Sequence, residues 1–226
     1  ENFLEPYLFN GKITASGMDV VSLYVDQYPD GDMSRDVAKQ YGINIYPTIG
    51  EALCDGGERL AVDAVLSIGE HGNYPHNEKG QHMYPRKRFF DGIVEVFRDS
   101  GRTVPVFSDK HLSYRWDFAK EMYDTAQSMD FGLMAGSSVP LAERWPPLEL
   151  PADAKIEAAV SIHGGGVESY DFHGVEVLQS MIEARAGGET GIQEVQFLEG
   201  DALWNAAEKG LWSIPVAEAA MAAELG

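Results

Sequence analysis

Positive charge, cysteine and long apolar runs are all scarce in this sequence. Its 226 residues include 17 lysines and arginines against 36 aspartates and glutamates, and the formal net charge is −19. Such a field repels phosphate backbones and anionic lipid, so we expect neither nucleic acid nor a membrane surface as a partner. No apolar run approaches the roughly 20 residues that span a bilayer. The single cysteine, Cys54, excludes an intrachain disulfide and fits a reducing, cytoplasmic compartment.

What the sequence does have is a core-forming composition in which strand and helix patterns alternate. Hydrophobic residues make up 44% of the chain. Helical spacing predicts that residues 1–10 form the end of a helix, and Ser34 and Thr48 are the expected caps of the next two helices. The near-continuous apolar run 61–68 is typical of a strand covered on both faces. We predict strands at 18–26, 43–46, 61–68, 104–107 and 132–136, and helices at 34–41, 49–53, 86–100 and 116–129. This alternation predicts an α/β fold with a Rossmann-like parallel sheet.

The texture of the sequence changes after Pro140, and the proline-rich segment 145–151 favours a domain boundary nearby. We predict a partial Rossmann-like nucleotide-binding domain over residues 1–140. A smaller α+β region over 141–226 is expected to serve substrate binding or oligomerisation and to be cut short. We expect the protein to be a homo-oligomer. Within the second region the patterns predict strands at 156–162 and 192–198 and helices at 172–185, 202–209 and 216–225.

Asp26 is the first candidate for binding a cofactor. It closes the predicted strand 18–26, and ligands of open parallel sheets bind outside the carboxyl ends of the strands. An acid at this place can hydrogen-bond a ribose hydroxyl of a dinucleotide, and its charge repels the 2′-phosphate of NADP, which favours NAD. The alternative interpretation is a turn aspartate.

A polar loop, 69–82, directly follows the most apolar predicted strand and contains three of the six histidines. Glu70 and His71 are candidates to contact a substrate, a cofactor or a divalent metal. Asn73 and Tyr74 of the same loop are assigned to substrate binding. The histidine spacing matches no standard zinc site, and His76 and His82 are interpreted as solvated loop histidines.

Two further groups are candidates for chemistry. Lys110 follows the predicted strand 104–107 and can orient a hydroxyl, or relay a proton if its pKa is depressed; otherwise it is a surface lysine paired with Asp109. His173 and Glu176 lie three residues apart at a predicted helix start, where the carboxylate can fix the tautomer of the imidazole. The alternative is a capping histidine beside a surface glutamate. His111 and Glu168, next to these groups, are assigned to substrate binding.

Taken in order, these segments resemble the motifs of the glucose–fructose oxidoreductase, inositol dehydrogenase and MocA-like family (Gfo/Idh/MocA). The resemblance covers roughly residues 18–200 and is carried by Val25-Asp26, 38–42, 46–53, 62–65, Asp109-Lys110-His111 and 171–176. It implies that Lys110 and His173 are a catalytic pair facing a sugar or polyol carbon, with NAD or NADP as hydride acceptor. The sequence departs from the family in five places. It has no GxGxxG, His111 replaces a proline, and Glu176 replaces an aspartate. The loop after Ile68 is longer and more polar than the family's turn, and the region after Pro151 is too short for the family's complete second-domain sheet. We expect the first strand and phosphate loop to lie outside this chain.

The leading hypothesis is therefore an NAD(P)-dependent oxidoreductase in which Lys110 polarises a hydroxyl and His173, steadied by Glu176, removes its proton. Lys110 and His173 are expected to line one cleft with Glu70 and His71. One alternative is a cofactor-free or metal-assisted lyase, isomerase or hydrolase, in which Glu70, His71 and His173 act directly or hold a divalent ion. A small-molecule binding protein without chemistry is the third possibility.

Overall fold

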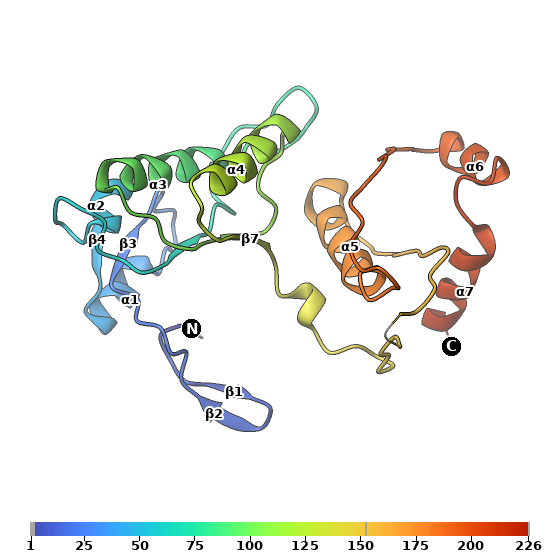
Figure 1. Ribbon diagram of the computed structural model, residues 1–226, viewed down its shortest axis with the longest axis horizontal. Coiled ribbons are helices and arrows are strands. Elements are labelled where there is room, and N and C mark those ends of the chain that lie inside the picture. Colours follow the sequence, from blue (N-terminus) through green and yellow to red (C-terminus); the bar gives the residue numbers. More distant parts are fainter. Residues whose placement is uncertain (1–2, 152, 226) are drawn as a thin grey trace. The chain divides into compact units, whose positions relative to one another are not determined.

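The computed structural model describes residues 3–151 and 153–225 (Figure 1). The chain divides into two compact units, unit 1 up to Gly136 and unit 2 from Ser137 onward. Each unit is described by itself. In the described part of the chain, every helix is too short or too polar to cross a membrane.

Unit 1 is built on parallel strands joined by helices. Its main sheet has the order β5 (Val65–Ser67), β6 (Val106–Asp109) and β7 (Leu133–Gly136), all parallel. A second parallel pair consists of β3 (Ser22–Tyr24) and β4 (Asn44–Tyr46). The connecting helices are α1 (Ser34–Tyr41), α2 (Ile49–Leu53), α3 (Arg86–Ser100) and α4 (Trp116–Ser128). The prediction of an α/β fold with a parallel sheet is confirmed at this level.

The core of unit 1 lies between the sheet and the helices α3 and α4, which pack together over the strands (Figure 1). Helical spacing places the apolar residues of α3 on one stripe, and that stripe is buried against side chains of β6 and α4. Its members are Phe90, Ile93, Val94 and Phe97, packed with Val104, Val106, Met122, Ala126 and Phe131. A strand does form within 61–68, but it is only Val65–Ser67. The expectation that it is covered on both faces is wrong, because Leu66, and Met134 of the same sheet, are 43% and 65% exposed.

Capping explains where the short helices start. The Thr48 hydroxyl accepts the Glu51 N–H at 3.1 Å and caps α2, as predicted. Ser34 is not a cap, because it is already the first residue of α1. Instead the Asp32 carboxylate accepts both the N–H and the hydroxyl of Ser34, at 3.2 and 2.8 Å. Gly42 ends α1 with a left-handed φ of 70°, as expected of a C-terminal glycine.

The prediction of a helix over residues 1–10 is wrong for the part that the structure describes. Residues 1 and 2 lie outside the described residues, and residues 3–6 form turns without a helix. Residues 7–14 form a hairpin of β1 (Tyr7–Phe9) and β2 (Lys12–Thr14). Asn10 and Gly11 join the strands with φ values of 48° and 75°. Both positions of such a two-residue turn need positive φ, which Asn-Gly supplies, so this local signal outweighs the helical spacing.

The regular elements of unit 2, in its described residues, are all helical. It contains the 3-10 turn η1 (Val139–Leu141) and the helices α5 (Val167–Ile182), α6 (Asp201–Glu208) and α7 (Ile214–Leu225). The strands predicted at 156–162 and 192–198 do not form there, so the α+β prediction for this region is wrong within the described residues. Val195 and Phe197 are 83% and 65% exposed. A segment of alternating apolar residues forms a strand only where another strand is placed to pair with it through backbone hydrogen bonds.

Candidate functional site

Five polar residues gather where β5 and β6 end, and we call them the edge cluster: Glu70, Arg86, Asp109, Lys110 and His111. The Lys110 ammonium lies between two carboxylates, 3.0 Å from Glu70 Oε2 and 3.1 Å from Asp109 Oδ2. The three side chains are only 20–23% exposed. Parallel strands bring their carboxyl ends to one sheet edge, and this explains why residues so far apart in the sequence meet here.

The charge state of Lys110 follows from these contacts. Burial acts to lower the pKa of Lys110, but hydrogen bonds to Glu70 and Asp109 outweigh it and hold the pKa above its ordinary value. The condition for a proton relay, a depressed pKa, is therefore not met. Lys110 remains a fixed cation that can orient or polarise an oxygen. It is paired with Glu70 as well as with Asp109.

Two residues of this region have an uncommon backbone conformation. His71 and Lys110 have φ values of 62° and 71° although neither is glycine. The Lys110 N–H donates to the Gly136 carbonyl at 2.9 Å, so the turn after β6 is tied to the end of β7. Non-glycine residues with positive φ are costly and cluster at functional sites, which makes this edge the leading candidate site of unit 1.

Arg86 is the member of the edge cluster that sequence reasoning missed. It is the first residue of α3, only 3% exposed, and its Nη1 lies 3.1 Å from His111 Nε2. A guanidinium can only donate, so His111 Nε2 accepts and its ring is held as the Nδ1–H tautomer. Burial lowers the pKa of Arg86, and the charges of Glu70 and Asp109 act in the opposite direction. The signal in the sequence was three basic residues, 86–88, at a helix start that has no acid in its first turn.

Asp26 lies at the end of β3 and is held by three donors. Its carboxylate accepts from Tyr24 at 2.5 Å, Tyr74 at 2.8 Å and Arg88 at 2.7 Å. The Arg88 hydrogen bond, helped by the two tyrosines, lowers the pKa of Asp26 to about 2 against burial. The pKa of Tyr74 is raised by burial and by Asp26. Asp26 thus has a structural role, because it links the end of β3 to the loop after β5 and to α3. Its Oδ1 accepts only the Tyr24 hydroxyl and keeps one further acceptor direction.

The loop after β5 is more ordered than its polar composition suggests. Gln27 receives the Asn73 N–H at 2.8 Å and donates to the Asn73 carbonyl at 3.2 Å. His82 stacks against His76 and Tyr84, with ring centroids 4.4 and 4.0 Å apart, and its Nε2 is buried without a hydrogen-bond partner among the described residues. The interpretation of His82 as a solvated histidine is wrong, because these rings cover it.

In unit 2, His173, Glu176 and Ser137 form one hydrogen-bonded group. Glu176 Oε2 lies 3.0 Å from His173 Nδ1 and accepts the Ser137 hydroxyl at 2.6 Å, while Oε1 accepts the Ser137 N–H at 2.7 Å. The side chains of His173 and Glu176 are 20% and 11% exposed. The carboxylate therefore receives the Nδ1 proton, which leaves Nε2 of His173 as the basic atom.

The position of this group differs from the prediction in one respect. Because α5 begins at Val167, His173 lies inside the helix and is not a capping histidine.

Glycines shape the surroundings of α5. Gly165 supplies a φ of 115° before the helix, where any side chain would collide with the Tyr170 ring. Gly174 is buried against the His163 ring. Glu168 is exposed in the first turn of α5, where a negative charge is favourable.

The Ser137 group is not arranged as a serine-hydrolase triad. In such a triad the serine contacts Nε2 of the imidazole and the acid contacts Nδ1. Here the Ser137 hydroxyl lies 3.2 Å from Nδ1, the same atom that faces Glu176, and it donates to the carboxylate. The hydroxyl is thus engaged as a donor and has no base to activate it.

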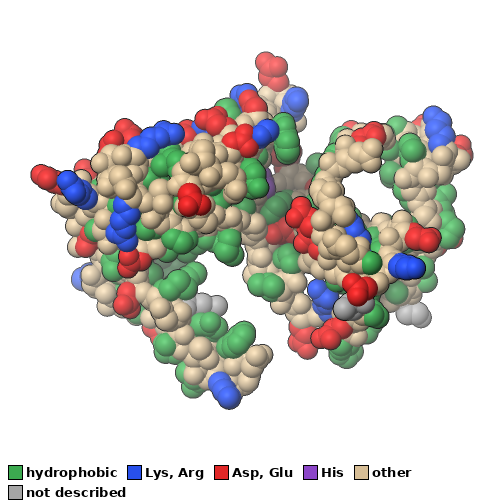
Figure 2. Space-filling model, in the orientation of Figure 1, with side chains coloured by type: hydrophobic (Ala, Val, Ile, Leu, Met, Phe, Trp, Pro, Cys, Tyr) green, Lys and Arg blue, Asp and Glu red, His purple; other side chains and the backbone are tan. Residues whose placement is uncertain are grey.

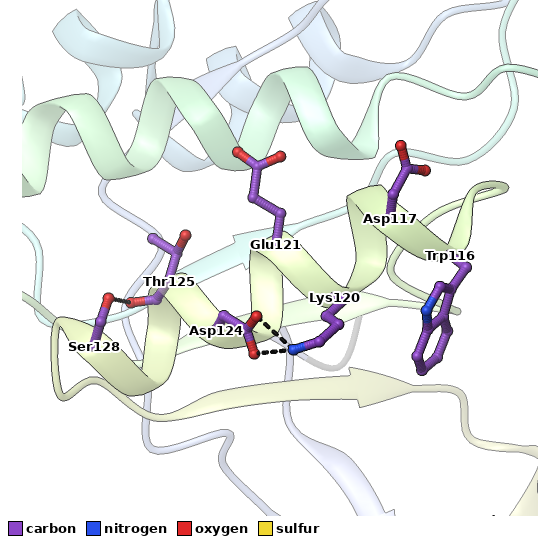
Figure 3. Close-up of a pocket in the computed structure, with 7 residues that line it drawn as sticks. All are labelled: Trp116, Asp117, Lys120, Glu121, Asp124, Thr125 and Ser128. Carbon is purple, nitrogen blue, oxygen red and sulfur yellow. Dashed lines mark hydrogen bonds and ion pairs between the residues drawn. The ribbon is translucent and has the colours of Figure 1, made fainter.

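Two hollows lie on the surface of unit 1. Along α4, a hollow of about 550 Å³ is lined by Trp116–Ser128 side chains in which Lys120 pairs with Asp124, and it contains none of the predicted site residues (Figure 3). Acidic and basic side chains are interspersed over this part of unit 1 (Figure 2). A groove of about 360 Å³ includes Tyr74 and Arg88 and so adjoins Asp26.

Among residues 3–151 and 153–225, no three His, Cys, Asp or Glu side chains are grouped to hold a metal ion.

Seven of the ten predicted site residues thus form three groups: Glu70, Lys110 and His111 at the sheet edge, Asp26 with Tyr74, and His173 with Glu176. The other three, His71, Asn73 and Glu168, are exposed and belong to none of these groups. Lys110 belongs to unit 1 and His173 to unit 2, so their common cleft stays a prediction. Comparison of the sequence with protein-family models and with curated proteins gives no match.

Proposed function

We propose that this chain is part of an NAD(P)-dependent oxidoreductase of the Gfo/Idh/MocA type, acting on a hydroxyl-bearing carbon of a sugar-like or polyol substrate. The observation that carries the proposal is the 3.0 Å contact between His173 Nδ1 and Glu176 Oε2. It gives His173 a fixed tautomer with Nε2 as proton acceptor, which is what oxidation of an alcohol requires of the protein. The order of the family-like segments along the sequence supports the same reaction.

The roles of the chain's own groups follow from their contacts. His173 Nε2 takes the hydroxyl proton, and Glu176 stabilises the imidazolium that forms. The Lys110 ammonium contacts three carboxylate oxygens, Glu70 Oε2 at 3.0 Å and Asp109 Oδ2 and Oδ1 at 3.1 and 3.3 Å, so a substrate oxygen would take the place of the longest of these contacts. As a fixed cation, Lys110 stabilises the negative charge that develops on that oxygen and does not exchange protons with it.

The fit of a dinucleotide to the chain is partial. Asp26 suits a ribose hydroxyl through the remaining acceptor direction of Oδ1, and the adjoining groove of about 360 Å³ offers aromatic walls. The sequence contains no GxGxxG to receive a pyrophosphate. Arg88, 2.7 Å from Asp26, offsets the charge on which a preference for NAD depends. Bound NAD or NADP would supply the hydride acceptor, a function for which proteins have no side chain.

A second candidate is a cofactor-free isomerase or lyase that removes a proton next to a carbonyl. It is favoured by the raised pKa of Lys110, because a permanent cation can stabilise an enolate without any hydride acceptor. His173 would act as the base in this reaction too. Neither the hydrolase nor the metal-assisted alternative has comparable support among the described residues.

An activity screen with matched variants tests the proposal. Reduction of NAD and NADP is followed with a panel of polyols, aldoses and sugar acids, for the wild type and for His173→Asn and Lys110→Met. We expect turnover in the wild type and losses of about 100-fold or more in kcat for His173→Asn, as for other general bases. Lys110→Arg should retain more activity than Lys110→Met, because it keeps the charge.

His163 provides the matched control, because it also pairs with a carboxylate, Asp171, at 3.1 Å in the same unit. His163→Asn should keep wild-type turnover if folding is preserved, as checked by circular dichroism. Equal losses in the two histidine variants would contradict a specific role for His173. Turnover of a substrate without any dinucleotide would favour the isomerase or lyase instead.

A further inference from the structure

Arg86 is a buried cation that the proposed chemistry leaves unused. Only 3% of the residue is exposed, and no carboxylate of the described residues forms an ion pair with it. The charges of Glu70 and Asp109 act on Arg86 and favour its charged form, but both carboxylates are paired with Lys110. A guanidinium buried without a counter-ion is costly, so a fold that keeps one gains something from it.

The hydrogen bonds of Arg86 leave one edge of the guanidinium without a partner among the described residues. Nη1 is used by His111, and the ring of Tyr84 lies 4.9 Å from the guanidinium carbon. Nε is buried without a partner, and no hydrogen bond of the described residues engages Nη2. The Nε–H and Nη2–H bonds point the same way and form the fork that binds two oxygens of a carboxylate or phosphate.

The surroundings keep this fork in place. A side chain at Gly69 would come within 2.7 Å of Arg86 Cγ, so the glycine leaves room for the stem of the arginine beneath the end of β5. His111 is held on the other side, after β6. Arg86 therefore belongs to the same sheet edge as Lys110, the fixed cation of the proposed reaction.

We infer that Arg86 binds an oxyanion of the substrate, so that the natural substrate is an acidic polyol or sugar derivative carrying a carboxylate or phosphate group. This inference rests on the proposed function for the polyol part of the ligand, but the anion site is defined by Arg86 alone. In a chain of net charge −19, an anionic substrate needs such a local cation to overcome general repulsion. Arg86 supplies the two-point contact through Nε and Nη2.

The test is a titration of the wild-type 226-residue chain followed through the ¹⁵N–¹H resonance of Arg86 Nε. Three probes are compared: gluconate, which has a carboxylate, glucose 6-phosphate, which has a phosphate, and glucitol, a neutral polyol. We expect saturable shifts of the Arg86 signal with gluconate, glucose 6-phosphate or both, and none with glucitol. The anion that binds more tightly identifies the source of the oxyanion. Arg88 Nε, which is paired with Asp26, is the internal control and should not move.

Arg86→Lys keeps the charge but loses the fork, and it should weaken binding of the anionic probe by about tenfold or more. Arg115→Lys, at an exposed arginine paired with Asp117, is the matched control and should bind as the wild type does. Equal shifts with glucitol and gluconate, or no shift with any probe, would overturn the inference. If neutral polyols are oxidised but the Arg86 Nε resonance does not shift with either anionic probe, only the inference about Arg86 fails and the proposed function stands.

Discussion

Units 1 and 2 hold their polar groups in place by different means. In unit 1, Phe97 and Met122 are each 1% exposed and belong to a continuous apolar core between the sheet and the helices α3 and α4. In the described part of unit 2, the buried apolar residues are Ala206 and Ala207. Its site depends on hydrogen bonds instead, above all the four that converge on Glu176 and His173. The comparison teaches that unit 1 is stabilised by burial, whereas unit 2 owes its local order to polar contacts.

The same contrast explains how far the sequence could predict the structure. The stripe of α3 and the Thr48 cap are local patterns that agree with the final packing, so helix bounds in unit 1 are predicted well. The segments 156–162 and 192–198 have a strand pattern but no partner strand, and pattern alone cannot provide one. In unit 2 the prediction of strands therefore fails, while the helices are found with shifted ends.

Shortening a core side chain of unit 1 should show the difference between the two units most clearly. Phe97→Ala removes a side chain that is 1% exposed and should cost about 3–5 kcal/mol of unfolding free energy. The control Val195→Ala, at a residue 83% exposed in unit 2, should change it by less than about 0.5 kcal/mol. Denaturant unfolding of both variants measures the difference. A loss at Val195 as large as that at Phe97 would show that unit 2 is also held by burial.

A smaller effect is expected at Asp26, where unit 1 uses a polar contact. Asp26→Asn should cost about 1–2 kcal/mol at neutral pH. The pKa of Asp26 is lowered to about 2 from an ordinary 3.8, so its contribution is complete above 3.8 and is lost as the pH falls toward 2. The wild type and the variant should therefore converge in stability below that range.

The control for this prediction is Asp63→Asn. Asp63 also pairs with an arginine at 2.7 Å, but its side chain is 96% exposed. Its substitution should leave stability nearly unchanged at every pH, because exposed ion pairs contribute little. If both variants lose the same amount with the same pH dependence, the buried network of Asp26 has no special role.

The smallest stability change is predicted for Ser137→Ala in unit 2, about 1 kcal/mol for a partly exposed hydrogen bond. Its effect on the site should be clearer, because the hydroxyl helps to fix the Glu176 carboxylate that holds the His173 tautomer. We expect ¹⁵N spectra to show a mixture of His173 tautomers in the variant and the Nδ1–H form in the wild type. Ser138→Ala is the control, and an unchanged tautomer in Ser137→Ala would remove the proposed positioning role.

The candidate site was predictable only in part, for reasons that particular residues make clear. His173 and Glu176 are one helical turn apart, so their contact follows from spacing. Lys110 and Glu70 meet because both follow strands of one parallel sheet. Ser137 lies 36 residues from His173 and has no local signal, since only the fold brings them together. Arg86 had a signal, a basic helix start, but its burial depends on Gly69 and could not be read from the sequence.

The most direct test of the central claim follows the hydrogen of the reacting carbon. A polyol or sugar acid that is turned over is supplied with deuterium on that carbon, and the products are analysed by mass spectrometry. Hydride transfer predicts that the deuterium appears on the nicotinamide ring of reduced NAD or NADP, while the hydroxyl proton taken by His173 exchanges with water. Release of the deuterium into water, with the dinucleotide unreduced, would contradict the oxidoreductase account and identify proton abstraction as the reaction.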